Sequence, residues 1–210
     1  MSVDGRLVRG ERTRRAVLDA AVVLATEVGL DGLSLGQLAE RLGVSKSGLF
    51  AHWTSKEELQ LATIDRAREQ WAEKILAPAL HEPRGVRRLW ALHTSRLRFY
   101  ETEVLPGGCF FANAEFEYNA RAGVVHDRLA VVFSEWLDLL ERLAREAVEV
   151  GELRDDVDVR RLAFEIEALG LVAVLQSRLL SPATAYDFAR RAVLDRLRAL
   201  CTDPSLLPEV

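Results

Sequence analysis

The chain has 210 residues, of which 49% are hydrophobic and 29% charged, and its formal net charge is -4. This length and composition allow a sizeable core, organised either as one large domain or as a small domain followed by a larger one. The mildly acidic charge does not exclude DNA as a partner, because DNA binding depends on the local charge of the docking face.

Cysteine usage and hydropathy argue against several classes of protein. Cys109 and Cys201 are far apart and form no CxxC pair, and the four histidines are scattered, which argues against a disulfide framework and a zinc module. The arginine-rich residues 1–15 lack the apolar segment of a signal peptide. The most apolar stretch, 168–175, is too short to span a bilayer. We therefore expect a cytoplasmic protein with no metal site, no cofactor and no membrane association.

Helical periodicity runs through nearly the whole chain, and no segment alternates convincingly as a strand. In chain order, helices are expected over about 13–28, 35–42, 45–50, 54–78, 84–101, 109–120, 124–150, 158–180 and 182–200. The fold class is therefore all-α. We expect a three-helix DNA-binding domain over residues 1–55, with a basic N-terminal arm, and a larger helical domain over 56–210.

The segment from about Ser34 to Trp53 predicts a helix-turn-helix. Ser34 is a good N-cap for a helix with a narrow apolar stripe, and Gly43 supplies the backbone freedom that a tight turn needs. Ser45 is expected to cap the short helix that follows. Val44 and Leu49 are expected to be buried under the helix crossing, and Trp53 to be core. The run Thr54–Glu57 predicts a capping box that opens the next helix.

Small polar residues at the start of the short helix would allow its backbone to approach the major groove of double-stranded DNA. Lys46, Ser47 and Gln37 are the candidates for base contacts, whereas hydroxyl, imidazole and ammonium groups on the same edge would contact phosphates. The candidate DNA-binding residues are Gln37, Ser45, Lys46, Ser47, Phe50, His52 and Lys56. Phe50 could equally pack against the preceding helix. Lys56 lies near a helix N-terminus, where a cation is unfavourable, and an external anion would resolve that conflict.

The region before the first helix is rich in arginine, with Arg6, Arg9, Arg12, Arg14 and Arg15. Such a segment could follow a groove or the phosphate backbone as a flexible arm, or it could be a solvated tail.

The continuous run RTRRAVLDAAVVLATEVGLDGLSLGQLAERLGVSKSGLFAHWTSKEEL resembles the N-terminal domain of the tetracycline-repressor (TetR) family. Its most specific parts are GLDGLSLGQLAERLGVSKSGLF and SKEEL. The resemblance implies a homodimer, a third helix that contacts DNA, and a C-terminal helical domain that binds a small molecule. The chain departs from common family features at Gly36, where threonine is frequent, and at Phe50-Ala51, where many relatives have an aromatic pair.

The helices over 124–150 and 158–180 each have an apolar face broader than one compact core needs. Pairing of both helices across a two-fold axis would bury the surplus in a homodimer, as the resemblance also implies. The alternative is that both are intramolecular core and that dimerisation occurs elsewhere.

The middle helices mix aromatic and isolated polar side chains, which is typical of a pocket for a partly apolar small molecule. Ordinary helical core explains most of these residues equally well. The candidate ligand contacts are Trp71, Trp90, His93, Leu97, Cys109, Phe110, Asn113 and Tyr118. Phe110 and Asn113 lie one turn apart and could face a cavity beneath the loop at 104–108.

Three functions compete at this point. The leading hypothesis is a transcription repressor that a small-molecule effector releases from DNA. An enzyme is disfavoured because no catalytic motif is present: Glu115, Glu117 and His126 are imaginable acid–base groups, but Glu115 and Glu117 fall on different helix faces. The third hypothesis, a helical binding or adaptor protein that has lost DNA binding, rests only on Gly36 and Ala51.

Overall fold

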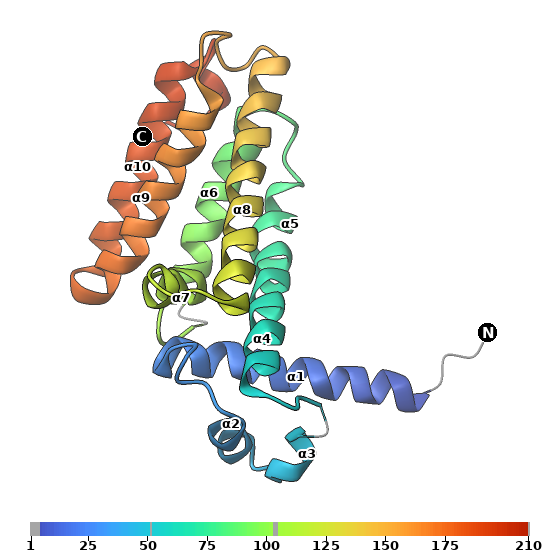
Figure 1. Ribbon diagram of the computed structural model, residues 1–210. Helices are drawn as coiled ribbons and strands as arrows, with labels where there is room; N and C mark the ends of the chain where they lie inside the picture. The colour runs from blue at the N-terminus through green and yellow to red at the C-terminus, as the bar shows by residue number, and fades with distance from the viewer. Residues whose placement is uncertain (1–4, 51, 103–104, 210) are drawn as a thin grey trace. The chain divides into compact units, whose positions relative to one another are not determined.

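The structure is a computed structural model that describes residues 5–50, 52–102 and 105–209 (Figure 1). Within these ranges the protein is helical and contains no strand; an isolated β-bridge joins Leu153 to Cys201. The all-α prediction is thus confirmed.

The helices follow the predicted order closely. Their bounds are α1 Gly5–Val28, α2 Leu35–Leu42, α3 Lys46–Phe50, α4 Lys56–Trp71, α5 Ala77–Ala79, α6 Val86–Glu101, α7 Phe110–Tyr118, α8 Val124–Glu149, α9 Val159–Leu179 and α10 Pro182–Leu200. A π-helical turn, Ala72–Leu76, joins α4 to α5, and a 3₁₀ turn, Pro204–Leu206, follows α10. The expected helix over 54–78 is therefore one helical run that widens to π geometry before Pro78.

The first helix begins earlier than expected. It extends back to Gly5, so the five arginines at 6–15 lie on a helix and not on a flexible arm or a disordered tail. The physical reason is local: arginine, leucine and glutamate have high helix propensity, and the helix over 13–28 already supplies the nucleus onto which they add.

The chain divides into two compact units, which differ from the expected domains at 1–55 and 56–210. The first unit comprises residues 1–69 and 105–130, and the second comprises 70–104 and 131–210. Residues 105–130, which carry α7 and the start of α8, thus belong to the same unit as the helix-turn-helix.

The first unit has its core where α1 meets α2 and α7. The apolar face of α1 is buried, with Ala21 and Val22 fully inaccessible. Leu33, in the loop before α2, and Leu38, in α2 itself, are also fully buried. This packing buries the apolar stripe of α2, as its spacing predicts.

The second unit is built around α6, α9 and α10, and α9 and α10 lie side by side (Figure 1). Its core contains a buried ion pair: the Arg96 guanidinium donates to both carboxylate oxygens of Glu167, at 2.6 and 3.0 Å. The Trp136 indole donates to the same carboxylate at 2.5 Å. A side chain at Gly170 would place its Cβ 2.5 Å from Arg96, so the glycine makes room for the guanidinium.

Arg96 also lies over aromatic rings. Its guanidinium carbon is 5.7 Å from the Trp71 ring centroid, 5.9 Å from that of Tyr100 and 5.4 Å from that of Trp136. Burial opposes the charge on Arg96, but Glu167 and Tyr100, through their charges and their hydrogen bonds, together outweigh burial and raise the pKa of Arg96. Arg96 is therefore charged inside the second unit, with hydrogen bonds and ring faces replacing water.

His93, one turn before Arg96 on α6, is 1% exposed. Burial lowers its pKa to about 3, and the positive charge of Arg96 acts in the same direction. The imidazole is therefore neutral in the folded protein at neutral pH, whereas in an unfolded chain a histidine takes up a proton at about pH 6.5.

This difference predicts acid sensitivity. Between about pH 6.5 and 3 the unfolded chain binds a proton at His93 that the folded chain does not bind, so stability falls as pH falls through that window. Going from pH 7 to pH 5 should cost about 2 kcal/mol at this site. We expect the urea midpoint of His93→Leu to change less between pH 7 and pH 5 than that of the wild type. The matched variant, His81→Leu, removes an exposed histidine and should retain the wild-type change; equal changes in all three proteins would contradict the assignment.

Candidate DNA-binding interface

The helix-turn-helix is defined by caps at both ends of α2. The Ser34 hydroxyl accepts the backbone N–H of Gln37 at 3.2 Å and donates to the side-chain oxygen of the same residue at 2.7 Å. At the other end Gly43 adopts a left-handed conformation with φ of 64°, and its N–H returns to the last carbonyls of the helix. These two features fix where α2 starts and where the chain turns toward α3.

The start of α3 is a polar, exposed turn. The Ser45 hydroxyl accepts the backbone N–H of Gly48 at 3.2 Å, and the Ser47 hydroxyl donates to Ser45 at 3.3 Å. The four residues 45–48 are exposed, whereas Leu49 on the next position is 3% exposed. Leu49 thus anchors the helix while its N-terminal turn remains accessible, the arrangement that docking in a major groove requires.

Contacts with α1 hold this surface in place. Trp53 is fully buried, as expected, and the Arg14 guanidinium of α1 lies 5.5 Å from its ring centroid. Arg41, in the last turn of α2, forms a two-pronged ion pair with Glu27 of α1 at 2.6 and 3.1 Å. The hydrogen bonds from Arg41 lower the pKa of the Glu27 carboxyl.

The structure brings the predicted DNA-binding residues together in the first unit. The side chains of Gln37, Ser45, Lys46, Ser47, His52 and Lys56 are all exposed there. The side chain of Phe50 lies outside the part of the chain that the structure describes, and so does Ala51. Val44 corrects the sequence analysis: it lies in the turn between α2 and α3 and is 47% exposed, not buried.

The opening of α4 is also shifted by one residue from the predicted capping box. The Ser55 hydroxyl accepts the N–H of Glu58 at 3.0 Å. The Glu58 carboxylate in turn accepts the N–H and the hydroxyl of Thr54, at 2.7 and 2.9 Å. These hydrogen bonds lower the pKa of Glu58. Lys56 therefore lies in the first turn of α4.

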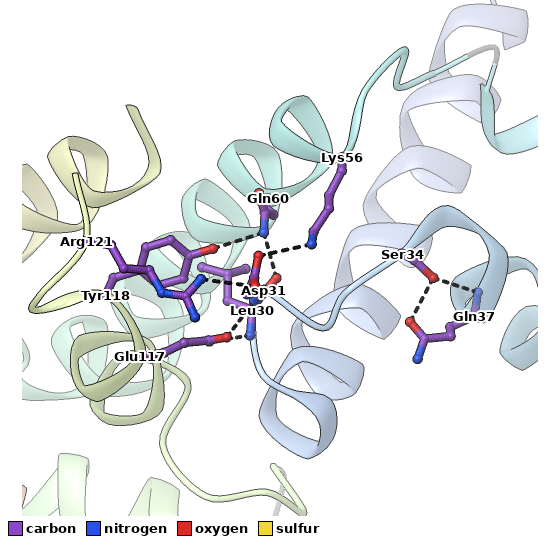
Figure 2. Close-up of polar contacts among 9 residues, drawn as sticks. All are labelled: Leu30, Asp31, Ser34, Gln37, Lys56, Gln60, Glu117, Tyr118 and Arg121. Atoms are coloured by element: carbon purple, nitrogen blue, oxygen red, sulfur yellow. Dashed lines mark hydrogen bonds and ion pairs between the residues drawn. The ribbon is translucent and has the colours of Figure 1, made fainter. Parts of the chain in front are cut away.

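A side chain from α7 fixes the loop between α1 and α2 (Figure 2). The Glu117 carboxylate accepts the backbone N–H groups of Leu30 at 2.7 Å and of Asp31 at 2.9 Å. The Gln60 amide, from α4, donates to the Leu30 carbonyl at 2.8 Å and to the Tyr118 hydroxyl at 3.0 Å. Both the donor and the acceptor of Leu30 are thus bound by side chains from other helices.

Asp31, in the same loop, pairs with two cations (Figure 2). Its Oδ1 lies 3.0 Å from the Lys56 ammonium, and its Oδ2 lies 3.0 Å from the Arg121 guanidinium. Hydrogen bonds from Lys56 and then Arg121 hold the pKa of Asp31 below its usual range. The anion that Lys56 needs at a helix N-terminus is therefore supplied within the chain.

Four of the predicted ligand contacts belong to the first unit, and three of these make hydrogen bonds there. The Cys109 sulfur accepts the N–H of Ala112 at 3.4 Å, and Tyr118 bonds to Gln60. The Asn113 amide donates to the carbonyls of Thr26 at 3.3 Å and of Gly107 at 3.0 Å, so it ties the loop before α7 to α1. Phe110 is buried.

The other four predicted ligand contacts belong to the second unit. Trp71 packs edge-on against Trp136 with ring centroids 4.7 Å apart, and Trp90 lies 6.1 Å from the His93 ring. Leu97 is fully buried.

Sequence reasoning missed the residues that fix the loop, Asp31, Gln60 and Arg121, and considered Glu117 only as an imagined acid–base group. Glu117 and Leu30 are 87 residues apart in the chain. Single-residue patterns carry no signal for such a pairing. The buried pair of Arg96 and Glu167 was missed for the same reason.

Comparison with known families decides what this architecture belongs to. The family model described as the C-terminal domain of tetracyclin repressor-like proteins matches residues 85–193, and the model of the bacterial regulatory proteins of the tetR family matches residues 17–63. The chain belongs to the tetracycline-repressor family. Members of this TetR family are ligand-responsive, DNA-binding regulators of transcription, and the leading hypothesis from the sequence is confirmed at that level.

Individual relatives agree with this. The HTH-type transcriptional regulator SrpR of Pseudomonas putida is 23% identical over 159 residues, which are 71% of this chain and 68% of the relative. The HTH-type transcriptional repressor ComR of Escherichia coli strain K12 is 27% identical over 151 residues, covering 71% of this chain and 72% of the relative. A TetR transcriptional regulator from Chloroflexus aurantiacus superposes with a TM-score of 0.84 at 27% identity, covering 92% of this chain and 98% of that one.

Two further findings concern the described part of the chain. None of its helices combines the length and the apolar character that crossing a membrane requires. Its histidine, cysteine, aspartate and glutamate side chains form no cluster that could hold a metal ion.

The Glu117 carboxylate should stabilise the first unit through its two backbone hydrogen bonds. Replacing it by a neutral amide in Glu117→Gln weakens both charge-assisted bonds, and we expect a loss of about 1–2 kcal/mol with faster exchange of the Leu30 and Asp31 amide protons. Urea unfolding and amide hydrogen exchange measure these effects. The control Glu40→Gln removes an exposed carboxylate of α2 and should change neither; unchanged exchange at Leu30 and Asp31 in Glu117→Gln would contradict the assignment.

Proposed function

We propose that this TetR-family regulator represses transcription by binding an operator as a homodimer, and that a small molecule bound in the second unit releases it. The exposed N-terminal turn of α3 carries the proposal, because residues 45–48 are accessible while Leu49 and Trp53 anchor the helix below them. With two such helices in a dimer, the half-sites would lie about one DNA turn apart, roughly 34–36 Å. Such a regulator acts where the DNA is, in the cytoplasm.

The residues proposed to contact DNA are those of the exposed surface around α3. Lys46 and Ser47 are placed to reach base edges, with Gln37 beside them at the start of α2, and Ser45, His52 and Lys56 to reach phosphates. A Phe50 contact is part of the same proposal. The name of ComR as a repressor supports repression over activation.

The exposed apolar side chains support a dimer through α9 and α10. Phe164, Val172 and Leu179 are spaced along one side of α9 and are 67%, 45% and 87% exposed, and Phe188 of α10 is 66% exposed. Several large apolar side chains exposed on two neighbouring helices support an interaction site there. For α8 we propose the alternative role of intramolecular core, which the burial of Leu140, Leu143 and Ala147 in a single chain supports, since each is at most 3% exposed.

The effector is proposed to bind in the second unit, against Trp71, Trp90, His93 and Leu97. The His93 imidazole is 1% exposed, and a polar group of the ligand would hydrogen-bond to it. The surrounding indole rings and the neutral state of His93 suit a partly apolar molecule with a hydrogen-bonding group. The ligand would release DNA by favouring a separation of the two α3 helices that does not match the half-sites.

DNA binding is tested with a duplex that the wild-type protein selects from random-sequence DNA. Lys46→Ala should weaken binding to that duplex about tenfold or more, since a lost lysine contact at each half-site costs about 1 kcal/mol or more. Fluorescence anisotropy at two salt concentrations measures the dissociation constant. Lys74→Ala removes an exposed lysine of the second unit and serves as the matched control. If no duplex is enriched, or if Lys46→Ala binds like Lys74→Ala, the proposed surface is wrong.

The dimer face is tested by placing a charge on it. Phe188→Arg should weaken self-association at least about hundredfold, because burying an unpaired charge at an interface costs several kcal/mol. Light scattering after size exclusion at low micromolar concentration distinguishes dimer from monomer. Leu80→Arg alters another exposed leucine, 48% exposed outside α9 and α10, and should leave the dimer intact. A dimeric Phe188→Arg would refute this face.

A further inference from the structure

Asp31 forms an ion pair with Lys56, one of the lysines of the proposed DNA surface. The Lys56 Nζ lies 3.0 Å from Asp31 Oδ1, and both side chains are about half exposed, at 50% and 46%. A DNA phosphate and Asp31 are therefore alternative anions for the same ammonium group. Binding DNA through Lys56 exchanges one anion for another.

Arg121 occupies the other oxygen of the same carboxylate. Its guanidinium lies 3.0 Å from Asp31 Oδ2, and it rests on the Tyr118 ring with 4.9 Å between the guanidinium carbon and the ring centroid. Lys56 and Arg121 thus bind different oxygen atoms and do not compete for one position (Figure 2). Asp31 can release Lys56 and still keep a cationic partner.

The backbone of Asp31 does not follow its side chain in this exchange. Its N–H and that of Leu30 are bound by Glu117, and Gln60 holds the Leu30 carbonyl. The Glu117 carboxylate already accepts these two N–H groups. The carboxylate described as the ion-pair partner of Arg121 is that of Asp31. The loop can therefore stay in place while the ammonium of Lys56 moves between its two anions.

We propose that Asp31 competes with DNA phosphate for Lys56 and that Arg121 sets the strength of this competition, so that these two residues, neither of which contacts DNA, determine operator affinity. Without Arg121, Asp31 would hold Lys56 more tightly and would be left as an unpaired anion beside the DNA backbone after Lys56 had moved. Arg121 is in this sense a positioning residue for Lys56. The inference rests on the proposed DNA contact of Lys56.

The experiment uses the full-length protein and the duplex selected by the wild type, with dissociation constants from fluorescence anisotropy. Asp31→Asn should bind about fourfold to twentyfold more tightly, because an exposed ion pair is lost at each of two half-sites. Arg121→Gln should bind more weakly by a similar factor. The matched pair Asp65→Asn and Arg128→Gln removes partners of an exposed ion pair in the same unit, 2.6 Å apart, and should leave the dissociation constant within about twofold.

Two double variants separate this mechanism from simple charge effects. In Asp31→Asn/Arg121→Gln the loss caused by Arg121→Gln should vanish, because its carboxylate target is gone. In Asp31→Asn/Lys56→Ala the gain caused by Asp31→Asn should vanish relative to Lys56→Ala, because the released ammonium is gone. A persistent Arg121 effect would mean direct DNA contact by Arg121, and a persistent Asp31 gain would mean general repulsion; each result overturns the proposal.

The outcomes also separate this inference from the proposed function. If Lys46→Ala weakens binding but Lys56→Ala and Asp31→Asn bind like the wild type, the operator-binding function stands and the exchange is wrong. If no duplex is enriched, the proposed function fails and the exchange fails with it. Circular dichroism and urea midpoints establish that each variant is folded, and the expected tighter binding of Asp31→Asn cannot arise from loss of structure.

Discussion

The Glu117 carboxylate is the interaction on which the geometry of the first unit depends. It binds two consecutive backbone N–H groups just after α1 ends, at Leu30 and Asp31, and so fixes the direction in which the chain leaves that helix. The start of α2 follows within a few residues, and the turn at Gly43 then sets α3. A part-buried carboxylate is costly to desolvate, but two charge-assisted hydrogen bonds offset that cost. The position of the exposed turn of α3 therefore depends on the hydrogen bonds of Glu117 to Leu30 and Asp31.

Two groups of ion pairs, one in each unit, differ in how far they are exposed. In the first, the ions of Asp31, Lys56 and Arg121 remain about half exposed, so each pair is weak and exchangeable. In the second, Arg96 and Glu167 are almost completely buried, at 2% and 6% side-chain exposure, and neither can lose its partner without leaving an uncompensated charge. The second arrangement favours one packing of α6 against α9, because the guanidinium lies where a Cβ at position 170 would come within 2.5 Å of it. An ion pair between a carboxylate and a basic side chain can thus be exchangeable when it is exposed at a binding surface, and it fixes the packing of helices when it is buried in a core.

What the sequence predicted was local. Ser34, Gly43 and the apolar spacing of α2 define a helix and its ends through contacts within a few residues, and Leu49 and Trp53 are buried as that pattern requires. Val44 failed because it lies in the turn between α2 and α3, outside both helices, where helical periodicity does not determine which side chain is buried.

What the sequence could not predict depends on partners distant in the chain. The apolar face of α8 is visible in its spacing, but spacing does not say whether the same chain or a second copy covers it; the structure buries it in the chain and leaves α9 and α10 with exposed phenylalanines. Likewise, four of the residues grouped as one ligand set fall in the first unit, where Asn113 and Tyr118 serve hydrogen bonds to other helices. Residue type alone does not separate a ligand contact from an internal one.

For Lys56 the sequence indicated correctly that a cation near a helix N-terminus calls for an anion, but it did not indicate that the chain itself supplies that anion. A cation in the first turn of a helix requires an anion, and in the free protein Asp31 supplies it. A phosphate that replaced Asp31 would form one ion pair with Lys56 while another is lost. Lys56 would therefore contribute less to the free energy of DNA binding than a lysine that gives up no ion pair on binding. In this proposal the Asp31 carboxylate and Arg121 together adjust the affinity of the first unit for DNA. Substitutions at these two positions would change DNA affinity without any change in the residues that face the bases. The helix-turn-helix sequence motif therefore does not reveal this contribution.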